Sequence, residues 1–166
     1  MNPELTHYLH MIEDLRRQVR DVIVGLPAEA LNWRPLPLSE AHETNSLAVM
    51  AAHVAGAEHF WIAEVIGRYP TTRDRPAEFV TEMDGPDGLL ARLDEVGAET
   101  SEVFARLTAV DLDETRQAHE RAVTTRWAIL HVIDHTALHL GHMQITYQLW
   151  MGGGSKPSPR WYERLP

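Results

Sequence analysis

The sequence predicts an all-α fold, a four-helix bundle with long loops between the helices and a short C-terminal tail. Four segments of roughly twenty residues carry apolar side chains at spacings of three and four, which is typical of amphipathic helices. Stretches rich in proline and glycine separate these segments. No segment shows the alternating pattern of a β-strand with comparable strength. Because 166 residues is an ordinary size for one folding unit, we expect a single domain over residues 1–166.

The first predicted helix extends from Pro3 to Val24. Proline suits the first turn of a helix, where its missing N–H group would have no partner anyway. Gly25 ends this helix. The following segment, Leu26 to Asn45, contains several prolines and is therefore predicted to be a long loop. The apolar face of the helix consists of Leu5, Leu9, Ile12, Leu15, Val19, Val22 and Ile23.

Two further helices are predicted in the middle of the chain. The second helix begins after an N-cap at Asn45 or Ser46, because both side chains can accept a hydrogen bond from the free N–H groups of a first turn. The segment Tyr69–Pro86 is predicted to be a loop. Asp87 is predicted to cap the third helix. The predicted helical ranges are 46–67 and 87–107.

The last predicted helix extends from Arg126 to about Met151 and begins after Thr124 or Thr125 as its N-cap. The segment before it, residues 108–125, is polar and is predicted to be extended or a loop. The segment after it, residues 152–158, is rich in glycine, serine and proline and is predicted to be a linker.

The composition excludes several kinds of site and partner. The chain has no cysteine, so a transition-metal site must use nitrogen and oxygen donors. A formal net charge of −9 argues against nucleic acid or an anionic membrane as a partner. No stretch approaches the ~18–20 apolar residues of a membrane span, and the first residues lack the pattern of a secretion signal. We therefore expect a cytoplasmic protein that binds neither nucleic acid nor a membrane.

Four histidines recur at helical spacing in the last predicted helix. At 100° per residue, His131, His135, His139 and His142 lie at about 0°, 40°, 80° and 20° around the axis, so one stripe holds all four. An i, i+4 pair on such a stripe can bind one ion but cannot complete its coordination shell. A further ligand must therefore come from elsewhere in the chain. His53 is a candidate because it lies on the apolar face of the second helix among small neighbours, and the alternative is a hydrogen-bonded core histidine.

These motifs resemble those of the DinB-like superfamily. The resemblance spans about residues 5–150 and implies a four-helix bundle, commonly dimeric, with a divalent ion held by one histidine of the second helix and an H-x-x-x-H pair of the fourth. Carried over to this chain, the metal ligands are His53, His135 and His139. The resemblance thus implies a homodimer and a divalent transition metal, zinc or nickel. The motifs are Leu31-Asn-Trp33-Arg-Pro35, a helix with His53 and Trp61, and His135-x-x-x-His139-x-Gly141.

The other two members of the stripe and one arginine are predicted to act beside the ion. His131 lies one turn before the ligand pair and His142 lies just beyond it. Each is predicted to pack or hydrogen-bond locally, or alternatively to support the ligands or face the substrate. Arg34 can recognise a carboxylate at the mouth of the site, while Trp33 and Pro35 are predicted to anchor and stiffen the long loop. The remaining histidines are predicted to be solvated, namely His7, His10, His42, His59 and His119.

Three neutral imidazoles leave coordination positions open, which is the arrangement of catalytic rather than structural ions. The resemblance implies thiol-dependent enzymes, so the leading hypothesis is a metal-dependent S-transferase that joins a small-molecule thiol to an electrophile. No general base is identifiable in the sequence. Two alternatives stay open: a metal-dependent hydrolase that uses activated water, and a non-catalytic dimer that binds a metal or ligand in a stress response.

Overall fold

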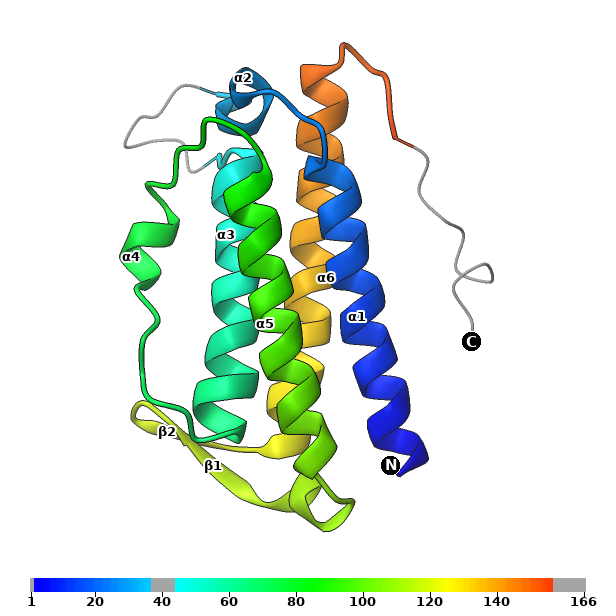
Figure 1. Ribbon diagram of the computed structural model, residues 1–166, viewed down its shortest axis with the longest axis vertical. Coiled ribbons are helices and arrows are strands. Elements are labelled where there is room, and N and C mark those ends of the chain that lie inside the picture. The colour runs from blue at the N-terminus through cyan, green and yellow to red at the C-terminus, as the bar shows by residue number, and fades with distance from the viewer. Residues whose placement is uncertain (1, 37–43, 157–166) are drawn as a thin grey trace.

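The computed structural model describes residues 2–36 and 44–156, and it is mostly helical. Four long helical segments lie side by side, each running most of the length of the molecule (Figure 1). Their positions confirm the four helices that the apolar spacing predicts. The segments are α1 (Pro3–Ile23), α3 (Leu47–Glu58) with its continuation η1 (His59–Ile66), α5 (Asp87–Arg106) and α6 (Thr125–Trp150).

Local capping explains where α1 and α3 begin, but not where α5 begins. Asn2 caps α1, since its side-chain oxygen accepts a hydrogen bond from the N–H of Glu4 at 2.8 Å. Ser46, one of the two predicted candidates, caps α3 by accepting from the N–H of Val49 at 3.2 Å. The predicted cap of α5 is wrong: Asp87 is the first residue of the helix, and Pro86 occupies the N-cap position without a side-chain hydrogen bond.

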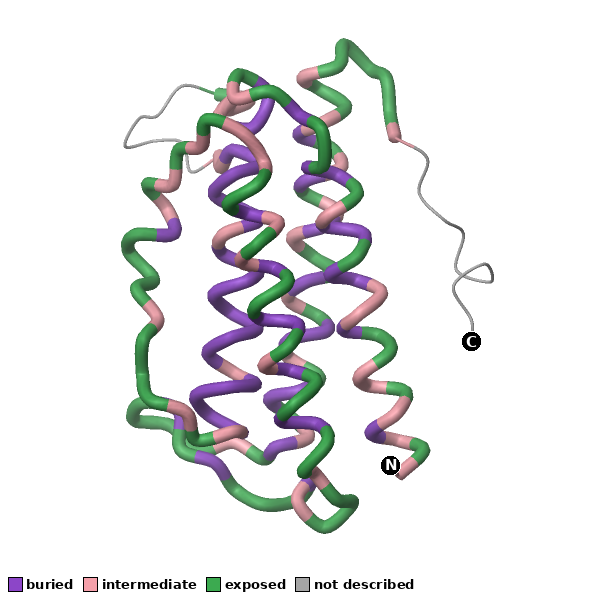
Figure 2. Tube along the Cα trace, viewed as in Figure 1, coloured by how far each residue is buried: buried purple, intermediate pink, exposed green. Residues whose placement is uncertain are grey.

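The α3 helix is the most deeply buried part of the bundle, with hardly any exposed residue along its length (Figure 2). Many of its residues are alanine or glycine, and small side chains allow neighbouring helices to approach closely. After Glu58 the helix continues with the wider turns of a π-helix, a form that occurs frequently at functional sites. One apolar core draws on all four long segments, with Leu5, Val54, Leu93 and Ile129 at no more than 1% exposure.

The two segments predicted to be long loops each contain a short helix, which the prediction missed. They are α2 (Ala28–Asn32) and α4 (Arg75–Glu78). Helices of four or five residues are too short to show an apolar periodicity. Trp33, just after α2, packs against Trp150 at the end of α6, with ring centroids 5.8 Å apart. This contact is in keeping with the predicted anchoring of the loop, of which residues 37–43 lie outside the described part of the chain.

The all-α prediction is wrong for one segment. The strands β1 (Thr115–Ala118) and β2 (Arg121–Thr124) form an antiparallel hairpin in which Thr115 pairs with Thr124. The hairpin covers one end of the bundle (Figure 1), and β1 packs against η1. Its strands have four residues each, and β1 buries Arg116 together with Ala118. A pattern of polar residues with so few apolar ones gives no recognisable strand signal.

Thr124 connects the hairpin to α6 and caps that helix, as one of the two predicted alternatives. Its hydroxyl accepts a hydrogen bond from the N–H of Trp127 at 3.1 Å. We expect Thr124→Ala to lower the free energy of unfolding by about 1 kcal/mol, because one N–H of the first turn loses its partner. Thr124→Ser keeps the hydroxyl and is expected to stay close to the original stability. Urea denaturation of both variants checks this, and equal losses in the two would contradict the capping role.

Among the described residues, none of the helices combines the length and the apolar character needed to cross a lipid bilayer.

Candidate metal centre

Three histidines from two helices converge on one point in the bundle. His53 comes from α3, and His135 and His139 come from successive turns of α6. One ring nitrogen of each lies within 4.8 Å of one ring nitrogen of each other. Within residues 2–36 and 44–156, no second group of three histidine, aspartate or glutamate side chains meets this distance. The structure therefore brings together the three residues predicted as ligands.

The spacing of these nitrogens fits a shared ion. The Nε2 atoms of His53 and His135 are 3.1 Å apart. Two nitrogens bound to one tetrahedral ion at about 2.0–2.1 Å are separated by about 3.3 Å. In addition, the Nδ1 atoms of His135 and His139 are buried and have no hydrogen-bond partner. Buried polar atoms of a native protein are normally satisfied, so neither ring is committed to a hydrogen bond at Nδ1. Three converging imidazoles are a donor set that suits a divalent transition metal.

Burial keeps the two α6 histidines neutral. It lowers the pKa of His135 to about 3, helped by the charges of His139 and His53. It lowers the pKa of His139 to about 4, helped by His53 and His142. Both rings therefore carry a free lone pair at neutral pH. Neutral imidazole is the form that binds a metal ion.

The ring nitrogen of His53 that faces away from His135 contacts a carboxylate that the sequence analysis did not predict. Its Nδ1 lies 2.8 Å from Oε2 of Glu78, the last residue of α4. Arg73 binds both oxygens of Glu78, with Nε at 2.6 Å from Oε1 and Nη2 at 2.9 Å from Oε2. Burial raises the pKa of Glu78, but the hydrogen bonds from Arg73 and His53 outweigh it and bring the pKa below its ordinary value. Glu78 is thus an ionised acceptor at neutral pH.

His131 and His142 lie on either side of the three histidines. The His131 ring stacks on Trp127 with centroids 4.9 Å apart and contacts Trp61 edge-on. Burial lowers the pKa of His131. His142 is exposed, and its ring centroid is 5.7 Å from that of His139. Their predicted roles in supporting the ligands or facing the substrate stay predictions.

Arg34 hydrogen-bonds to the segment before α3 and to Phe79 rather than to the histidines. Its guanidinium donates hydrogen bonds to the carbonyl oxygens of Thr44 at 2.7 Å and of Phe79 at 3.4 Å. Phe79 in turn packs against the ring of His53, with centroids 5.0 Å apart. Arg34 therefore links the segment before α3 to Phe79, whose ring packs against His53. Recognition of a substrate carboxylate by Arg34 stays a prediction.

The prediction that His59 is solvated is wrong. His59 is 4% exposed and lies at the start of η1. Its Nδ1 is 2.6 Å from Glu99 on α5, and its Nε2 is 2.9 Å from the hydroxyl of Thr72 and 3.3 Å from Glu64. The sequence context of His59 is polar, but these polar partners come from other turns and elements and make burial possible. His7, His10 and His119 are exposed as predicted, and His42 lies outside the described residues.

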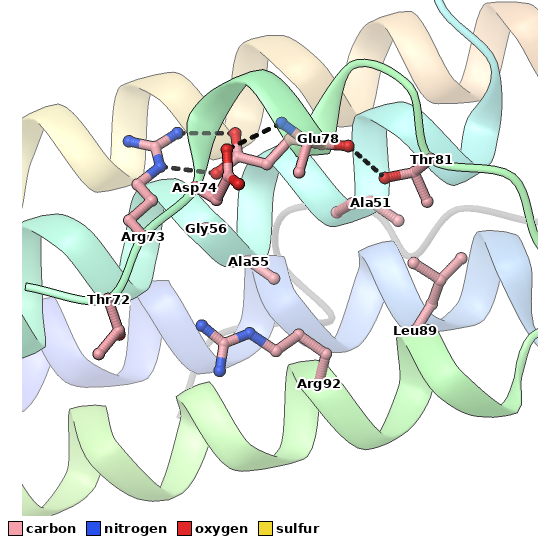
Figure 3. Close-up of a pocket in the computed structure, with 12 residues that line it drawn as sticks. Ala51, Ala55, Gly56, Thr72, Arg73, Asp74, Glu78, Thr81, Leu89 and Arg92 are labelled. Atoms are coloured by element: carbon pink, nitrogen blue, oxygen red, sulfur yellow. Dashed lines mark hydrogen bonds and ion pairs between the residues drawn. The ribbon is translucent and has the colours of Figure 1, made fainter.

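A cavity of about 240 Å³ lies beside Glu78, between α3, α5 and the segment 72–81 (Figure 3). Alanines and Gly56 of α3 form one wall, and Arg92 extends toward it from α5. Arg73 and Glu78 face each other at its edge (Figure 3). Glu78 therefore lies between this cavity and His53.

Comparisons with known proteins agree with this architecture. The family model described as mycothiol-S-transferase matches residues 7–152. A conserved protein from Enterococcus faecalis has a similar solved structure, with a TM-score of 0.69 and 15% identity over 89% of this chain and 96% of the other. A DinB-like protein from Bacillus cereus ATCC 10987 gives a TM-score of 0.68 and 17% identity over 93% of this chain and 95% of the other. At such identities these structures show the fold alone. No curated protein matches the sequence.

Proposed function

Because the chain belongs to the mycothiol-S-transferase family of the DinB-like superfamily, we propose that it transfers a low-molecular-weight thiol to an electrophile at a three-histidine metal site. The observation that carries the proposal is the convergence of His53, His135 and His139, with one nitrogen of each within 4.8 Å of the others. These three residues are the proposed ligands of a divalent transition metal, zinc or nickel. Imidazole suits both metals.

The surroundings of His135 and His139 allow both rings to bind an ion without first losing a proton. With pKa values lowered to about 3 and about 4, His135 and His139 are already neutral at pH 7. Phe79 packs beside His53 and keeps water from part of its ring surface. Three protein ligands leave at least one coordination position for a substrate.

The chemistry that a bound divalent ion supplies here is to lower the pKa of a neighbouring thiol, so that the thiol is a nucleophile at neutral pH. In the overall reaction the thiol proton goes to solvent, the sulfur forms a bond to the electrophilic carbon, and the leaving group departs with the bonding electron pair. The described residues near the three histidines include no carboxylate that faces them except Glu78, which already binds Arg73 and His53. A separate general base is therefore not part of the proposal.

The proposed assembly is a homodimer. Several large apolar side chains on one face of α6 are between 45% and 57% exposed. Contiguous apolar surface is uncommon on monomeric proteins and is typical of interaction sites. These side chains support the dimer that the family resemblance implies. They are Trp127, Leu130, Leu138, Ile145 and Leu149.

Thiol conjugation tests the proposed activity. Protein loaded separately with zinc and nickel is incubated with mycothiol, bacillithiol or glutathione and a fluorogenic alkylating electrophile. We expect metal-dependent conjugation of at least one thiol, with mycothiol preferred because of the family match. A chelator is expected to return the rate to that of the thiol alone, because an unassisted thiol with a pKa near 8.5 is only about 3% ionised at pH 7.

Two results would contradict this function. Metal-loaded protein that ignores every thiol but hydrolyses esters or amides would favour a metal-dependent hydrolase. Metal-loaded protein that is inert in both assays, and that loses only thermal stability when the metal is removed, would favour a non-catalytic binding module.

A further inference from the structure

The two ring nitrogens of His53 have different and complementary surroundings. Its Nε2 faces His135 across 3.1 Å, whereas its Nδ1 faces Glu78 across 2.8 Å. Glu78 forms an ion pair with the guanidinium of Arg73 through both of its oxygens, and such a carboxylate can only accept a hydrogen bond. The proton of the His53 ring therefore lies on Nδ1, and Nε2 presents its lone pair toward the α6 histidines. His135 and His139 differ in this respect, because their Nδ1 atoms have no hydrogen-bond partner.

Glu78 is itself held in place from two sides. The guanidinium of Arg73 binds both of its oxygens, at 2.6 Å and 2.9 Å, which is the rigid fork geometry that arginine forms with carboxylates. The backbone N–H of Arg73 donates to Oε1 of Glu64 at 2.9 Å. Glu64 belongs to η1, which continues the helix that carries His53. A chain of hydrogen bonds therefore runs from Glu64 through Arg73 and Glu78 to His53. Both of its ends lie on the same continuous helical segment, which restricts the position of the His53 ring.

Gly56 makes this arrangement sterically possible. It follows His53 by three residues and therefore lies on a neighbouring part of the α3 surface. A Cβ atom at position 56 would lie 2.0 Å from Oε1 and 2.7 Å from Cδ of Glu78. The Glu78 side chain thus occupies the space that any larger residue would fill (Figure 3). Because Gly56 has no side chain, the carboxylate of Glu78 can lie against α3 and reach His53.

We propose that Glu78 is a positioning residue for the metal site, which holds His53 as the Nδ1–H tautomer and aims its Nε2 at the ion, with Arg73 and Gly56 fixing Glu78. This inference rests on the proposed three-histidine metal site. Histidine ligands commonly donate their outer N–H to a carboxylate, and loss of that partner typically weakens metal binding by 10–100-fold. Segment 72–81, which the sequence predicts to be a loop, is therefore part of the metal centre.

Zinc affinity of the purified full chain, measured by competition with a chromogenic chelator, tests the proposal. We expect Glu78→Ala to weaken zinc binding about 10–100-fold. Glu78→Gln keeps an oxygen that can accept from Nδ1–H but loses the ion pair with Arg73, so an intermediate loss is expected. Gly56→Ala is expected to act in the same direction as Glu78→Ala, because the added Cβ displaces the carboxylate.

Asp74→Ala is the matched control. Asp74 caps α4 by accepting from the N–H of Ala77 at 3.1 Å, whereas the carboxylate bound to His53 is that of Glu78, so removal of the Asp74 side chain loosens the same short helix without touching the ligand. The zinc affinity of Asp74→Ala is expected to stay within about 3-fold of that of the original protein, which is well below the loss of about 10–100-fold expected for Glu78→Ala. Equal zinc affinities of Glu78→Ala and the original protein, or an equal loss in Asp74→Ala, would overturn the proposal.

A measurement on metal-free protein separates this proposal from the proposed function. Nitrogen-15 NMR of the histidine rings reports which nitrogen carries the proton. The Nδ1–H tautomer of His53 is expected in the original protein and in Asp74→Ala, and its loss is expected in Glu78→Ala. If the original protein binds neither zinc nor nickel, the proposed function fails while this result still decides the role of Glu78. Finding the Nε2–H tautomer in the metal-free original protein would overturn the proposal.

Discussion

Replacing His135 by alanine is expected to remove metal binding and thiol transfer together. The affinity for zinc should fall by more than about 100-fold, because loss of a direct ligand costs more than loss of an outer partner. Thiol conjugation at pH 7 should fall at least about 30-fold, since the thiol then depends on its own small ionised fraction. Alanine favours helix, so α6 itself should persist. Metal content per chain and the conjugation rate of the same preparation check both expectations.

His142→Ala is the matched control for this variant. His142 lies on the same stripe of α6 but is exposed and is not one of the three converging histidines. Its substitution should leave metal content unchanged. The three-histidine site is wrong if His53→Ala, His135→Ala and His139→Ala all retain the metal content of His142→Ala. Loss of activity with full metal content in His135→Ala would instead separate the ligand role from catalysis.

Replacing Arg16 by methionine is expected to cause a large loss of stability. Arg16 on α1 forms an ion pair with Glu58 at the end of α3, and Thr100 on α5 donates to the same carboxylate oxygen at 2.6 Å. Glu58 is only 1% exposed. Without Arg16 a buried carboxylate has no counter-charge, which typically costs about 3–5 kcal/mol. Urea denaturation at neutral pH measures this loss.

Arg17→Met is the neighbouring control, since Arg17 pairs with Asp14 at the surface and such pairs contribute at most about 1 kcal/mol. A second control, Arg16→Met combined with Glu58→Gln, removes the uncompensated charge and is expected to recover much of the stability. If Arg16→Met is no less stable than Arg17→Met, the buried pair does not stabilise the bundle as described.

The loss in Arg16→Met should also depend on pH. Burial raises the pKa of Glu58 above its ordinary value even though Arg16 lowers it, so removal of Arg16 raises the pKa further. When the pKa of a carboxyl group is higher in the folded state than in the unfolded state, the folded state binds the proton more tightly. Proton binding then contributes to the free energy of unfolding at low pH, and this contribution is lost as the pH rises. The difference in the free energy of unfolding between Arg16→Met and the original protein should therefore become smaller as the pH falls from neutral toward about 4.5, the ordinary pKa of a glutamate.

The four long helices could be predicted because their signals are local. The spacing of apolar residues and the caps at Ser46 and Thr124 depend only on neighbours a few residues away. The extended alternative predicted for residues 108–125 fits the two strands, but their pairing into a hairpin was missed because the strands are short and mostly polar. The hairpin is held in place by its packing against η1. The helices α2 and α4 were missed because one turn is too short for a period to appear.

The candidate metal site also depended partly on local signals and partly on the tertiary structure. His135 and His139 could be paired from the sequence, since residues four apart on one helix lie on the same face. His53 followed from its position on an apolar face and from the family resemblance, and the structure brings it to the pair. Glu78 and Arg73 could not be found, because they lie in a segment with no periodic pattern and meet His53 only through the path of the chain.

The sequence by itself determined the helices, the stripe of histidines and the nitrogen-rich donor set, because these depend on chemistry and spacing within one helix. Only the tertiary structure decided that His53 faces His135, that Glu78 holds the other side of His53, and that His59 and Glu58 are buried. The reason is physical: a polar side chain can be buried only when partners from other elements offset the loss of water. Those partners are brought close by the packing of the whole bundle rather than by their neighbours in the chain.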